Sequence, residues 1–334
     1  MLLPPALRAS DWRWALLLVA AALPGCGSWG APAAPAPPSL PATALRSAAP
    51  PPTTTRWQAV HHWLYQLQNL DLERAAASGF DLIVTDYSAD GSEQRRYTRE
   101  QVAKLRAGPR GPRLVVAYLS IGEAEDYRYY WQPDWRPGRP DWLHPMNPQW
   151  RGNYPVEYWR PEWKRLLYGE PDAYLDKILD AGFDGVYLDL IEAYEFFEHV
   201  RPSARQDMVQ LVQEIAYHAR ITRGKPDFGV IPQNGEPLID LPGYLDVITG
   251  IGREDLYYGY TRDNAPSPPE FTARVEHYLD RYVAAGKLVL TVDYTQRPDQ
   301  VADAYRRARE RGYVPYATVR ALDRMVINRG YDPE

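Results

Sequence analysis

Short apolar runs rich in β-branched and aromatic residues alternate with longer stretches of helical spacing from Trp57 onward. The strand-like runs are Trp63–Gln68, Leu82–Tyr87, Leu114–Ser120, Val186–Leu190, Phe228–Pro232, Val247–Ile251, Leu288–Tyr294 and Val314–Thr318. Alternating strands and helices build parallel βαβ units, and eight such units in about 270 residues are typical of a closed barrel. The pattern predicts an α/β fold, a (β/α)₈ TIM barrel, as a single domain over residues 56–332.

An open doubly wound sheet is the alternative fold. Two features of the alternation of strands and helices bear on it. The link between the fifth and sixth runs, Asn234 to Asp246, is short for a helical crossover and is the weakest unit. No Gly-rich phosphate turn follows the first run, so a nucleotide-binding version of the open sheet is disfavoured.

The chain begins with the pattern of an export signal. Arg8 and Arg13 precede a short apolar run, Trp14–Leu23, and Cys26 follows a small residue. This pattern predicts a signal peptide over residues 1–26 with a lipobox-like end, in which Cys26 becomes lipidated. An ordinary cleaved secretory signal is the alternative. We expect a secreted protein or a membrane-anchored lipoprotein, in the periplasm or at the cell surface, that meets the membrane only through this N-terminal anchor.

Residues 27–55 are dominated by Ala, Pro, Ser and Thr, as in Ala31–Pro38 and Pro50–Thr55. Such a segment has too few large apolar residues to bury a core. It predicts a disordered linker that holds the folded domain away from a membrane.

Composition excludes several functions. Cys26 is the sole cysteine, so an intramolecular disulfide and a cysteine-based zinc site are impossible. The net charge is −5 and no dense Lys/Arg run is present, which argues against nucleic-acid binding. The 25 Tyr and 11 Trp against 6 Phe suit either the rim of a wet cleft or a large core with satisfied polar tips.

The segment from Ser120 to Pro161 breaks the rhythm with some 40 residues that lack clear periodicity. It follows a strand and would therefore lie over the C-terminal face of a barrel, where active sites form. Its aromatic residues predict a substrate-binding wall, and a self-packed lid is the alternative. They are Tyr127, Tyr129, Tyr130, Trp131, Trp135, Trp142, Trp150, Tyr154, Tyr158 and Trp159.

Acidic residues gather where the predicted strands end, and histidines do not. The acids are Asp86, Glu123, Glu125, Asp126, Asp189, Glu192, Glu236, Glu254, Asp255 and Asp293. A serine or cysteine nucleophile would normally need a histidine base, and a zinc site would need His or Cys ligands. Carboxyl groups beside aromatic faces are what glycoside cleavage needs, since one acid protonates the leaving oxygen and another attacks or activates water.

Asp189 is the sharpest catalytic candidate, because an acid inside the apolar run Gly185–Leu190 is costly unless it is partnered or functional. A structural acid that caps a loop is the alternative reading. Position alone leaves Glu254, Glu123 and Asp293 as rivals for the second acid, and Glu254 could instead belong to a solvated charge cluster. The predicted substrate-binding residues are Asp86, Tyr118, Glu123, Tyr187, Gln233, Asn234 and Asp293.

Six phrases in order resemble one known family from about Trp57 to Tyr331. They are Tyr65–Gln68, Asp86–Ser88, Ala117–Glu125, Asp184–Asp189, Gln233–Glu236 and Arg253–Asp255. The family is the endo-α-1,4-polygalactosaminidase-like glycoside hydrolases, family 114 and its bacterial relatives. The resemblance implies an α/β barrel, no cofactor, endo-hydrolysis of α-1,4-linked galactosamine, and catalytic acids at the ends of strands four and six. On that basis Asp189 would be the nucleophile and Glu254 the acid/base of a retaining mechanism.

Two other functions stay open at this point. A barrel lipoprotein that binds an amino-sugar polysaccharide without cutting it would keep the aromatic wall but lack a properly spaced acid pair. A metal-assisted hydrolase could use Asp86, Asp189 and Asp293, since oxygen ligands suffice for magnesium or calcium.

Overall fold

The computed structural model describes residues 55–333. The predicted signal peptide, Cys26 and nearly all of the predicted linker lie outside the described residues. Within residues 55–333, none of the helices combines the length and the apolar character needed to cross a membrane.

The strands that form the body of the described chain are parallel. They are β1 (Trp63–Tyr65), β2 (Leu82–Thr85), β3 (Leu114–Ser120), β6 (Gly185–Asp189), β7 (Gly229–Pro232), β8 (Gly250–Glu254), β9 (Leu288–Asp293) and β10 (Val314–Ala317). Hydrogen-bonded ladders join them in the orders β1-β2-β3-β6-β7 and β10-β9-β8. Every residue of β3 is buried, as expected for a parallel strand covered on both faces. The predicted α/β class and the parallel strands are confirmed.

Further contacts link the two sheets. An isolated parallel bridge pairs Gln233 with Gly252, and the Thr249 amide donates to the Val230 carbonyl at 2.8 Å. At the other edges the Trp63 indole donates to the Val314 carbonyl at 3.0 Å. The ladders run as two sheets, so closure into one continuous hydrogen-bonded barrel stays a prediction.

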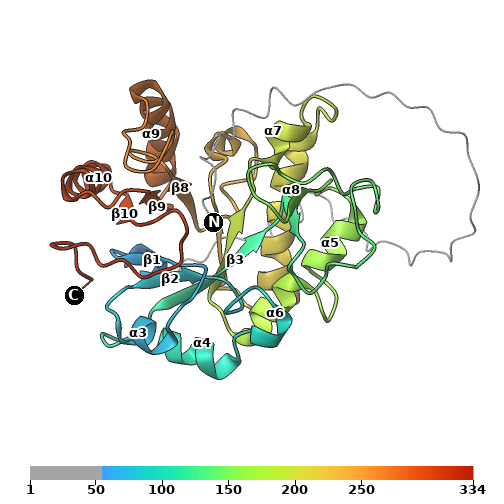
Figure 1. Ribbon diagram of the computed structural model, residues 1–334, viewed down its shortest axis with the longest axis horizontal. Helices are drawn as coiled ribbons and strands as arrows, with labels where there is room; N and C mark the ends of the chain where they lie inside the picture. Colours follow the sequence, from blue (N-terminus) through green and yellow to red (C-terminus); the bar gives the residue numbers. More distant parts are fainter. Residues whose placement is uncertain (1–54, 334) are drawn as a thin grey trace, which may run out of the picture.

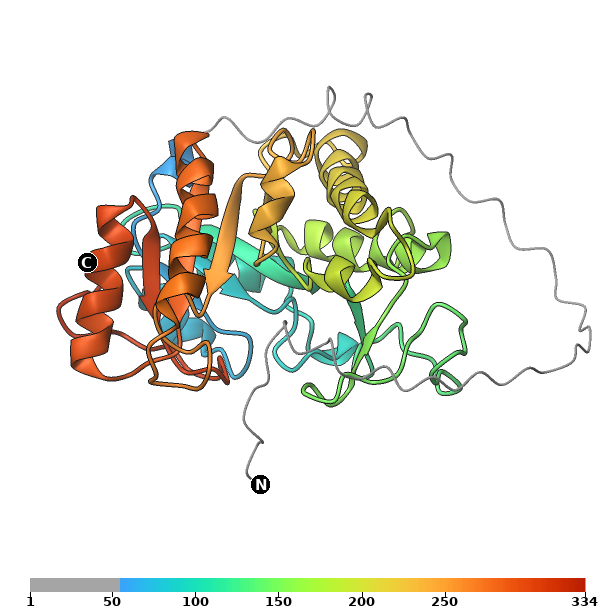
Figure 2. The ribbon, with the colours of Figure 1, turned by 90° about the horizontal axis from the view of Figure 1, so that it is seen from above.

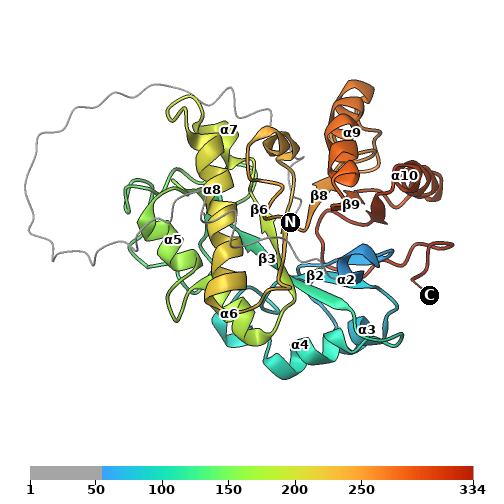
Figure 3. The same ribbon diagram turned by 180° about the vertical axis from the view of Figure 1, so that it is seen from behind.

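Helices flank these strands (Figure 1). They are α2 (Thr55–Gln58), α3 (Leu72–Ala77), α4 (Arg99–Arg106), α5 (Pro161–Leu167), α6 (Tyr174–Ala181), α7 (Ala193–Phe197), α8 (Ala204–Tyr217), α9 (Pro269–Ala284) and α10 (Pro298–Glu310). Short turns of helix add η2 (Glu93–Arg95), η3 (His218–Thr222) and η4 (Glu236–Asp240). Between β7 and β8 the connection holds only η4, which agrees with its prediction as the weakest unit. Seen from behind, the long α8 lies beside α5, α6 and α7 (Figure 3).

The long aromatic segment folds around a small antiparallel hairpin. Its strands are β4 (Glu123–Glu125) and β5 (Asn153–Pro155), with Glu125 paired to Asn153. Seen from above, the orange and red strands point toward the edge of the molecule where the green segment between β3 and α5 lies (Figure 2). The segment therefore lies at the carboxyl ends of the strands, as predicted.

Most strands differ from their predicted ranges only at one or both ends, but one strand is displaced as a whole. The run Val247–Ile251 was expected as a strand, whereas β8 spans Gly250–Glu254. Val247 and Ile248 are buried in the turn that leads into the strand, so their apolar character reflects burial and not strand pairing. This shift makes Glu254 the last residue of its strand.

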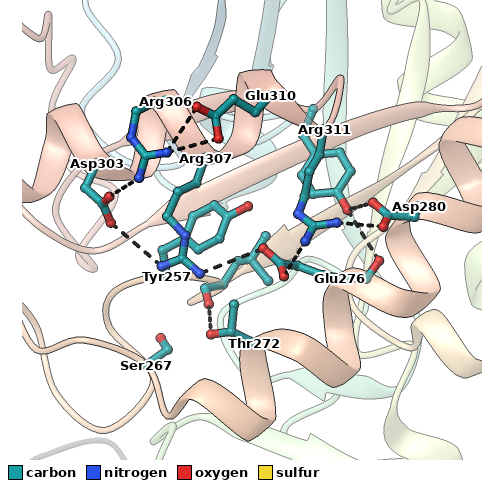
Figure 4. Close-up of polar contacts among 12 residues, drawn as sticks. Tyr257, Ser267, Thr272, Glu276, Asp280, Asp303, Arg306, Arg307, Glu310 and Arg311 are labelled. Carbon is teal, nitrogen blue, oxygen red and sulfur yellow. Dashed lines mark hydrogen bonds and ion pairs between the residues drawn. The ribbon is translucent and has the colours of Figure 1, made fainter.

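A network of ion pairs links helices α9 and α10, in which Glu276 is buried and its arginine partners are partly exposed (Figure 4). Arg311 donates to Glu276 at 2.9 Å and to Asp280 at 2.7 Å, and Arg307 lies over the Tyr257 ring at 4.1 Å. Solvent-exposed pairs of this kind add little stability singly. The network fixes α10 against α9, which packs on β9.

Aromatic rings fill the space between the strands. Trp63 and Tyr65 of β1, Tyr187 of β6 and Tyr316 of β10 pack with ring centroids between 5.1 and 6.2 Å apart. Each of the four is at most 2% exposed. Much of the Tyr and Trp content therefore serves the core.

Gly252 of β8 makes room for one of these rings. A Cβ atom at this position would lie 1.9 Å from Tyr187 Oη and 2.5 Å from its Cζ. We expect Gly252→Ala to lower the free energy of unfolding by about 1–3 kcal/mol through overpacking. Urea denaturation followed by fluorescence measures the loss.

The double variant Gly252→Ala/Tyr187→Phe tests the cause. The Tyr187 hydroxyl is buried and has no hydrogen-bond partner among the described residues, so Tyr187→Phe alone should cost little. It should recover part of the loss in the Gly252→Ala background. Strict additivity of the two changes would show that β6 and β8 do not meet in this way.

Candidate functional site

Asp189 is the last residue of β6, and neutral donors hold its carboxylate. Tyr118 of β3 donates to Oδ2 at 2.7 Å, while Gln233 and the Leu190 amide donate to Oδ1 at 3.1 and 2.8 Å. The Gln233 side chain is itself fixed by the Tyr65 hydroxyl at 3.0 Å. Three neighbouring strand ends and the aromatic core thus orient one half-buried carboxylate.

Glu254 ends β8 in a similar setting. The Tyr294 hydroxyl donates to its Oε2 at 2.8 Å, and its own amide donates to Asn234 Oδ1 at 3.4 Å. Asn234 follows β7, so the backbone at the end of β8 is tied to the neighbouring strand. The carboxylate of Glu254 is again held by a phenol and not by a cation.

The two acids influence each other electrostatically. Burial, and secondarily the negative charge of Glu254, raise the pKa of Asp189 to about 7. The Tyr118 hydroxyl and the Leu190 amide oppose that rise, because they stabilise the charged carboxylate. The structure therefore brings the two predicted catalytic acids into one site.

The backbone enters the left-handed region directly after three of these strand-end groups. Leu190, Asn234 and Asp255 have φ values of 61°, 60° and 60°, in the left-handed region that side chains other than Gly, Asn and Asp rarely adopt. Each residue follows a side chain of the site, at Asp189, Gln233 and Glu254. At Leu190 this conformation is strained, and such strain persists only where the surroundings enforce it and clusters at functional sites.

Several predicted substrate-binding residues form the layer that supports the acids. Tyr118 and Gln233 bond to Asp189, and Asn234 bonds to the Glu254 backbone. All three are at most 6% exposed. Tyr187 is wholly buried in the aromatic core. The geometry favours roles in orienting the site over the predicted direct contact with a sugar.

Asp86 and Glu125 share a buried cation. Arg128, 1% exposed at its side chain, forms ion pairs with Asp86 at 2.8 Å and with Glu125 at 2.6 Å. Tyr127 donates its hydroxyl to Glu125 and lies under the Arg128 guanidinium. These two acids are neutralised within the protein, and sequence reasoning missed the arginine because its partner at Asp86 lies 42 positions away.

Asp293 and Glu123 are also engaged internally. Asp293 is fully buried, and its Oδ1 accepts the amides of Tyr257 and Tyr258 at 2.6 and 2.8 Å. That arrangement holds the segment after β8 and favours a structural role over the predicted sugar contact. Glu123 accepts from Asn147 at 2.9 Å, and burial raises its pKa to about 7.

The acids do not assemble into a metal site. Asp86 is paired with Arg128 and Asp293 with backbone amides, so these two are not combined with Asp189 as a metal-assisted mechanism would require. In the part of the chain that the structure describes, no group of three or more His, Cys, Asp and Glu is placed to hold an ion.

The long aromatic segment serves mostly as its own core. Trp142 and Trp163 pack at 5.7 Å, Trp131 and Tyr154 at 4.8 Å, and Tyr130 is 4% exposed. The self-packed alternative is thus correct for most of its rings. Tyr127 and Trp150 differ, because 48% and 52% of each residue is exposed.

Those two rings lie at one end of the β4–β5 hairpin. Tyr127 follows β4 and Trp150 precedes β5, beyond the pair Glu125 and Asn153. The other end of the hairpin begins at Glu123, whose carboxyl interacts electrostatically with Asp189. The hairpin therefore runs from the acids toward an exposed aromatic surface.

Fold and site together define an α/β protein with paired acids at the carboxyl ends of parallel strands. The sequence profile of glycoside-hydrolase family GH114 matches residues 41–332. The chain is similar to an uncharacterised protein of Deinococcus radiodurans, 39% identical over 287 residues, which cover 84% of this chain and 87% of the relative. An uncharacterised protein of Thermotoga maritima is 38% identical over 288 residues, covering 81% of this chain and 85% of the relative.

Solved structures share the fold. The glycoside hydrolase domain of PelA from Pseudomonas aeruginosa is 18% identical with a TM-score of 0.58, covering 80% of this chain and 98% of that one. A mutant trehalulose synthase in complex with Tris is 13% identical with a TM-score of 0.51, covering 78% of this chain and 65% of that one. The chain belongs to glycoside-hydrolase family GH114, which confirms the family expected from its motifs.

Proposed function

We propose that this protein hydrolyses an α-1,4-linked galactosamine-type polysaccharide by a retaining two-carboxylate mechanism on a closed (β/α)₈ barrel. The observation that carries the proposal is the meeting of Asp189 and Glu254 in one site, where each is held by neutral donors. Membership in the family supports the reaction class, and the resemblance of its motifs supports the linkage.

Asp189 is the nucleophile in this proposal. Tyr118 and Gln233 aim its two oxygens, so the carboxylate meets the anomeric carbon in a fixed orientation. Attack forms a glycosyl ester with Asp189 and breaks the bond to the leaving oxygen. Because its pKa is raised to about 7, Asp189 is a better nucleophile once ionised than an ordinary exposed aspartate.

Glu254 is the acid and then the base. It donates its proton to the leaving glycosidic oxygen, and it later takes a proton from the water that hydrolyses the ester. The Tyr294 hydroxyl fixes its Oε2 through both steps. Retention of configuration follows from the two successive displacements at the same carbon.

The charge balance of the site supports a cationic sugar. Asp86 and Glu125 are paired with Arg128, whereas Asp189 and Glu254 have no cationic partner in the described chain within hydrogen-bond reach. A deacetylated amino sugar carries an ammonium group that complements this uncompensated negative charge. Neutral or anionic polymers gain no such attraction.

The variant Asp189→Asn tests the chemistry. It keeps the shape but removes the nucleophile, so cleavage of defined α-1,4-galactosamine oligomers should fall at least about a thousandfold. Mass spectrometry of the products measures the rate and shows whether cuts are internal. The exposed Asp227→Asn is the matched control and should cleave at the wild-type rate.

Three outcomes would contradict the proposal. Unchanged cleavage by Asp189→Asn removes the nucleophile. Binding of oligomers by the wild-type protein without any cleavage favours a polysaccharide-binding barrel. Loss of activity in chelator, restored by a divalent ion, favours a metal-assisted hydrolase.

Trp150 and Tyr127 extend the substrate site in this proposal, as flat faces for sugar rings distant from the cut. We expect Trp150→Ala to raise KM for long oligomers roughly tenfold, the effect of about 1.4 kcal/mol of stacking. The kcat on the shortest substrates should not change. Ile221→Ala, an equally exposed apolar residue after α8, is the control. An equal effect on short and long oligomers would contradict a distant subsite.

We also propose that Cys26 is lipidated and anchors the enzyme to a membrane, in the periplasm or at the cell surface. Residues 27–55 would then connect this anchor to the folded domain. We expect the mature protein to begin with a diacylglyceryl-modified Cys26. Mass spectrometry of the N-terminal peptide from membranes tests this, and an unmodified N-terminus would favour an ordinary secretory signal.

A further inference from the structure

Glu192 is an acid of the site for which the mechanism above has no use. It lies three residues after Asp189 and directly before α7, and its Oε1 accepts from the Asn234 side chain at 3.0 Å. Its Oε2 is shielded from water and has no hydrogen-bond partner among residues 55–333. A charged carboxylate oxygen in that position would be costly, whereas a protonated one is far less so.

The groups around Glu192 also disfavour its charge. Asp189 of β6 and Glu254 of β8 repel it, and the phenols of Tyr187, Tyr194 and Tyr244 bring no positive charge. The nearby cation, Arg253, forms its ion pair with Glu236 at 3.3 Å.

The pKa values of Glu192 and Asp189 are both raised. Burial and then the charge of Asp189 raise the pKa of Glu192 to about 8, while the pKa of Asp189 is raised to about 7. The negative charge of an ionised Asp189 helps Glu192 to keep its proton. Paired carboxyls with pKa values pushed apart are typical of sites that need one charged and one neutral acid.

Asn234 connects Glu192 to the end of β8. Its Nδ2 donates to Glu192 Oε1, and its Oδ1 accepts from the Glu254 amide at 3.4 Å and from Arg253 at 3.2 Å. Asn234 has a φ of 60°, in the left-handed region that asparagine tolerates well, and the turn places its side chain between Glu192 and the end of β8. A protonated Glu192 would carry its proton on Oε2, because Oε1 accepts from Asn234.

We propose that Glu192 is a positioning residue of this site, whose neutral carboxyl holds Asn234 and, through it, the Glu254 end of β8. The inference rests on the proposed function, because it assigns a role within the same site. When Glu192 ionises, a third negative charge repels both catalytic acids and the site loses its working charge pattern.

The first test does not require any activity. Glu192→Gln stays neutral at every pH. In the wild type, Glu192 ionises in the unfolded chain near pH 4.3, whereas the folded protein keeps this proton up to the raised pKa of about 8, so stability falls as pH rises between the two values. The difference between the thermal unfolding midpoints of Glu192→Gln and the wild type should therefore increase in favour of the variant by more than about 3 °C from pH 5 to pH 8. A constant difference across this range would overturn the proposal.

The second test uses cleavage of galactosamine oligomers. The alkaline limb of kcat against pH should move upward in Glu192→Gln, because the ionisation that ends activity is gone. Glu192→Ala, which leaves Asn234 without its acceptor, should lose about 10- to 100-fold in kcat with little change in KM. Glu195→Gln removes one exposed charge from α7 and is the control. It should change neither the alkaline limb nor kcat.

The outcomes separate the two proposals. An unmoved limb in Glu192→Gln, or a wild-type rate in Glu192→Ala, overturns the positioning role. A loss in Glu192→Gln as large as that in Asp189→Asn would make Glu192 the proton donor, which also overturns it. If the wild type cleaves nothing, the proposed function fails, while the unfolding experiment still reports whether Glu192 keeps its proton.

Discussion

Tyrosine hydroxyls, not cations, hold the carboxyl groups at the ends of β6 and β8. Tyr118 donates to Asp189, Tyr294 to Glu254, and Tyr65 to the Gln233 that supports Asp189. An arginine in any of these places would lower the pKa of its partner and cancel its charge. A phenol fixes the geometry of the carboxylate and leaves its charge available. The aromatic core reaches the site through such hydroxyls, which ties the composition of the chain to its chemistry.

The acids of the molecule therefore fall into two groups. Asp86 and Glu125 are compensated by Arg128, and Asp255 by Arg320 at 2.9 Å. These pairs build the walls of the site, since a buried pair costs stability mainly when one partner is removed. The second group, at the ends of β6 and β8 and just beyond them, is uncompensated. Burial raises pKa values in both groups, but only in the second is no arginine within hydrogen-bond reach to oppose the rise for Asp189.

Much of the fold could be read from the sequence, because parallel strands buried on both faces appear as apolar runs. The range of β3 was predicted to the residue, and Asp189 stood out as an acid in such a run. The shift at β8 arose because Val247 and Ile248 are buried in a turn, which periodicity cannot distinguish from a strand. Sequence reasoning did not single out Arg128, Tyr294 or Glu192 as parts of the site. Their roles depend on contacts between segments far apart in the chain. The sugar contacts predicted at Asp86 and Asp293 rested on position alone. Position at a strand end does not show whether an acid is already engaged by another group of the protein.

The aromatic segment between β3 and α5 connects the fold to the candidate site. Ser120 ends β3 and pairs with Asp189, the Ile121 amide donates to the Asp189 carbonyl at 3.1 Å, and the hairpin starts at Glu123. The first residues of the segment are thus bonded to the backbone of the predicted nucleophile. Its buried rings form a small core against which the hairpin packs, and the two exposed rings lie at the end of the hairpin away from Glu123. The self-packed lid, one of the two alternatives posed from the sequence, describes most of these rings. The substrate wall stays a proposal, and it concerns only Tyr127 and Trp150, which face solvent at one end of the packed hairpin.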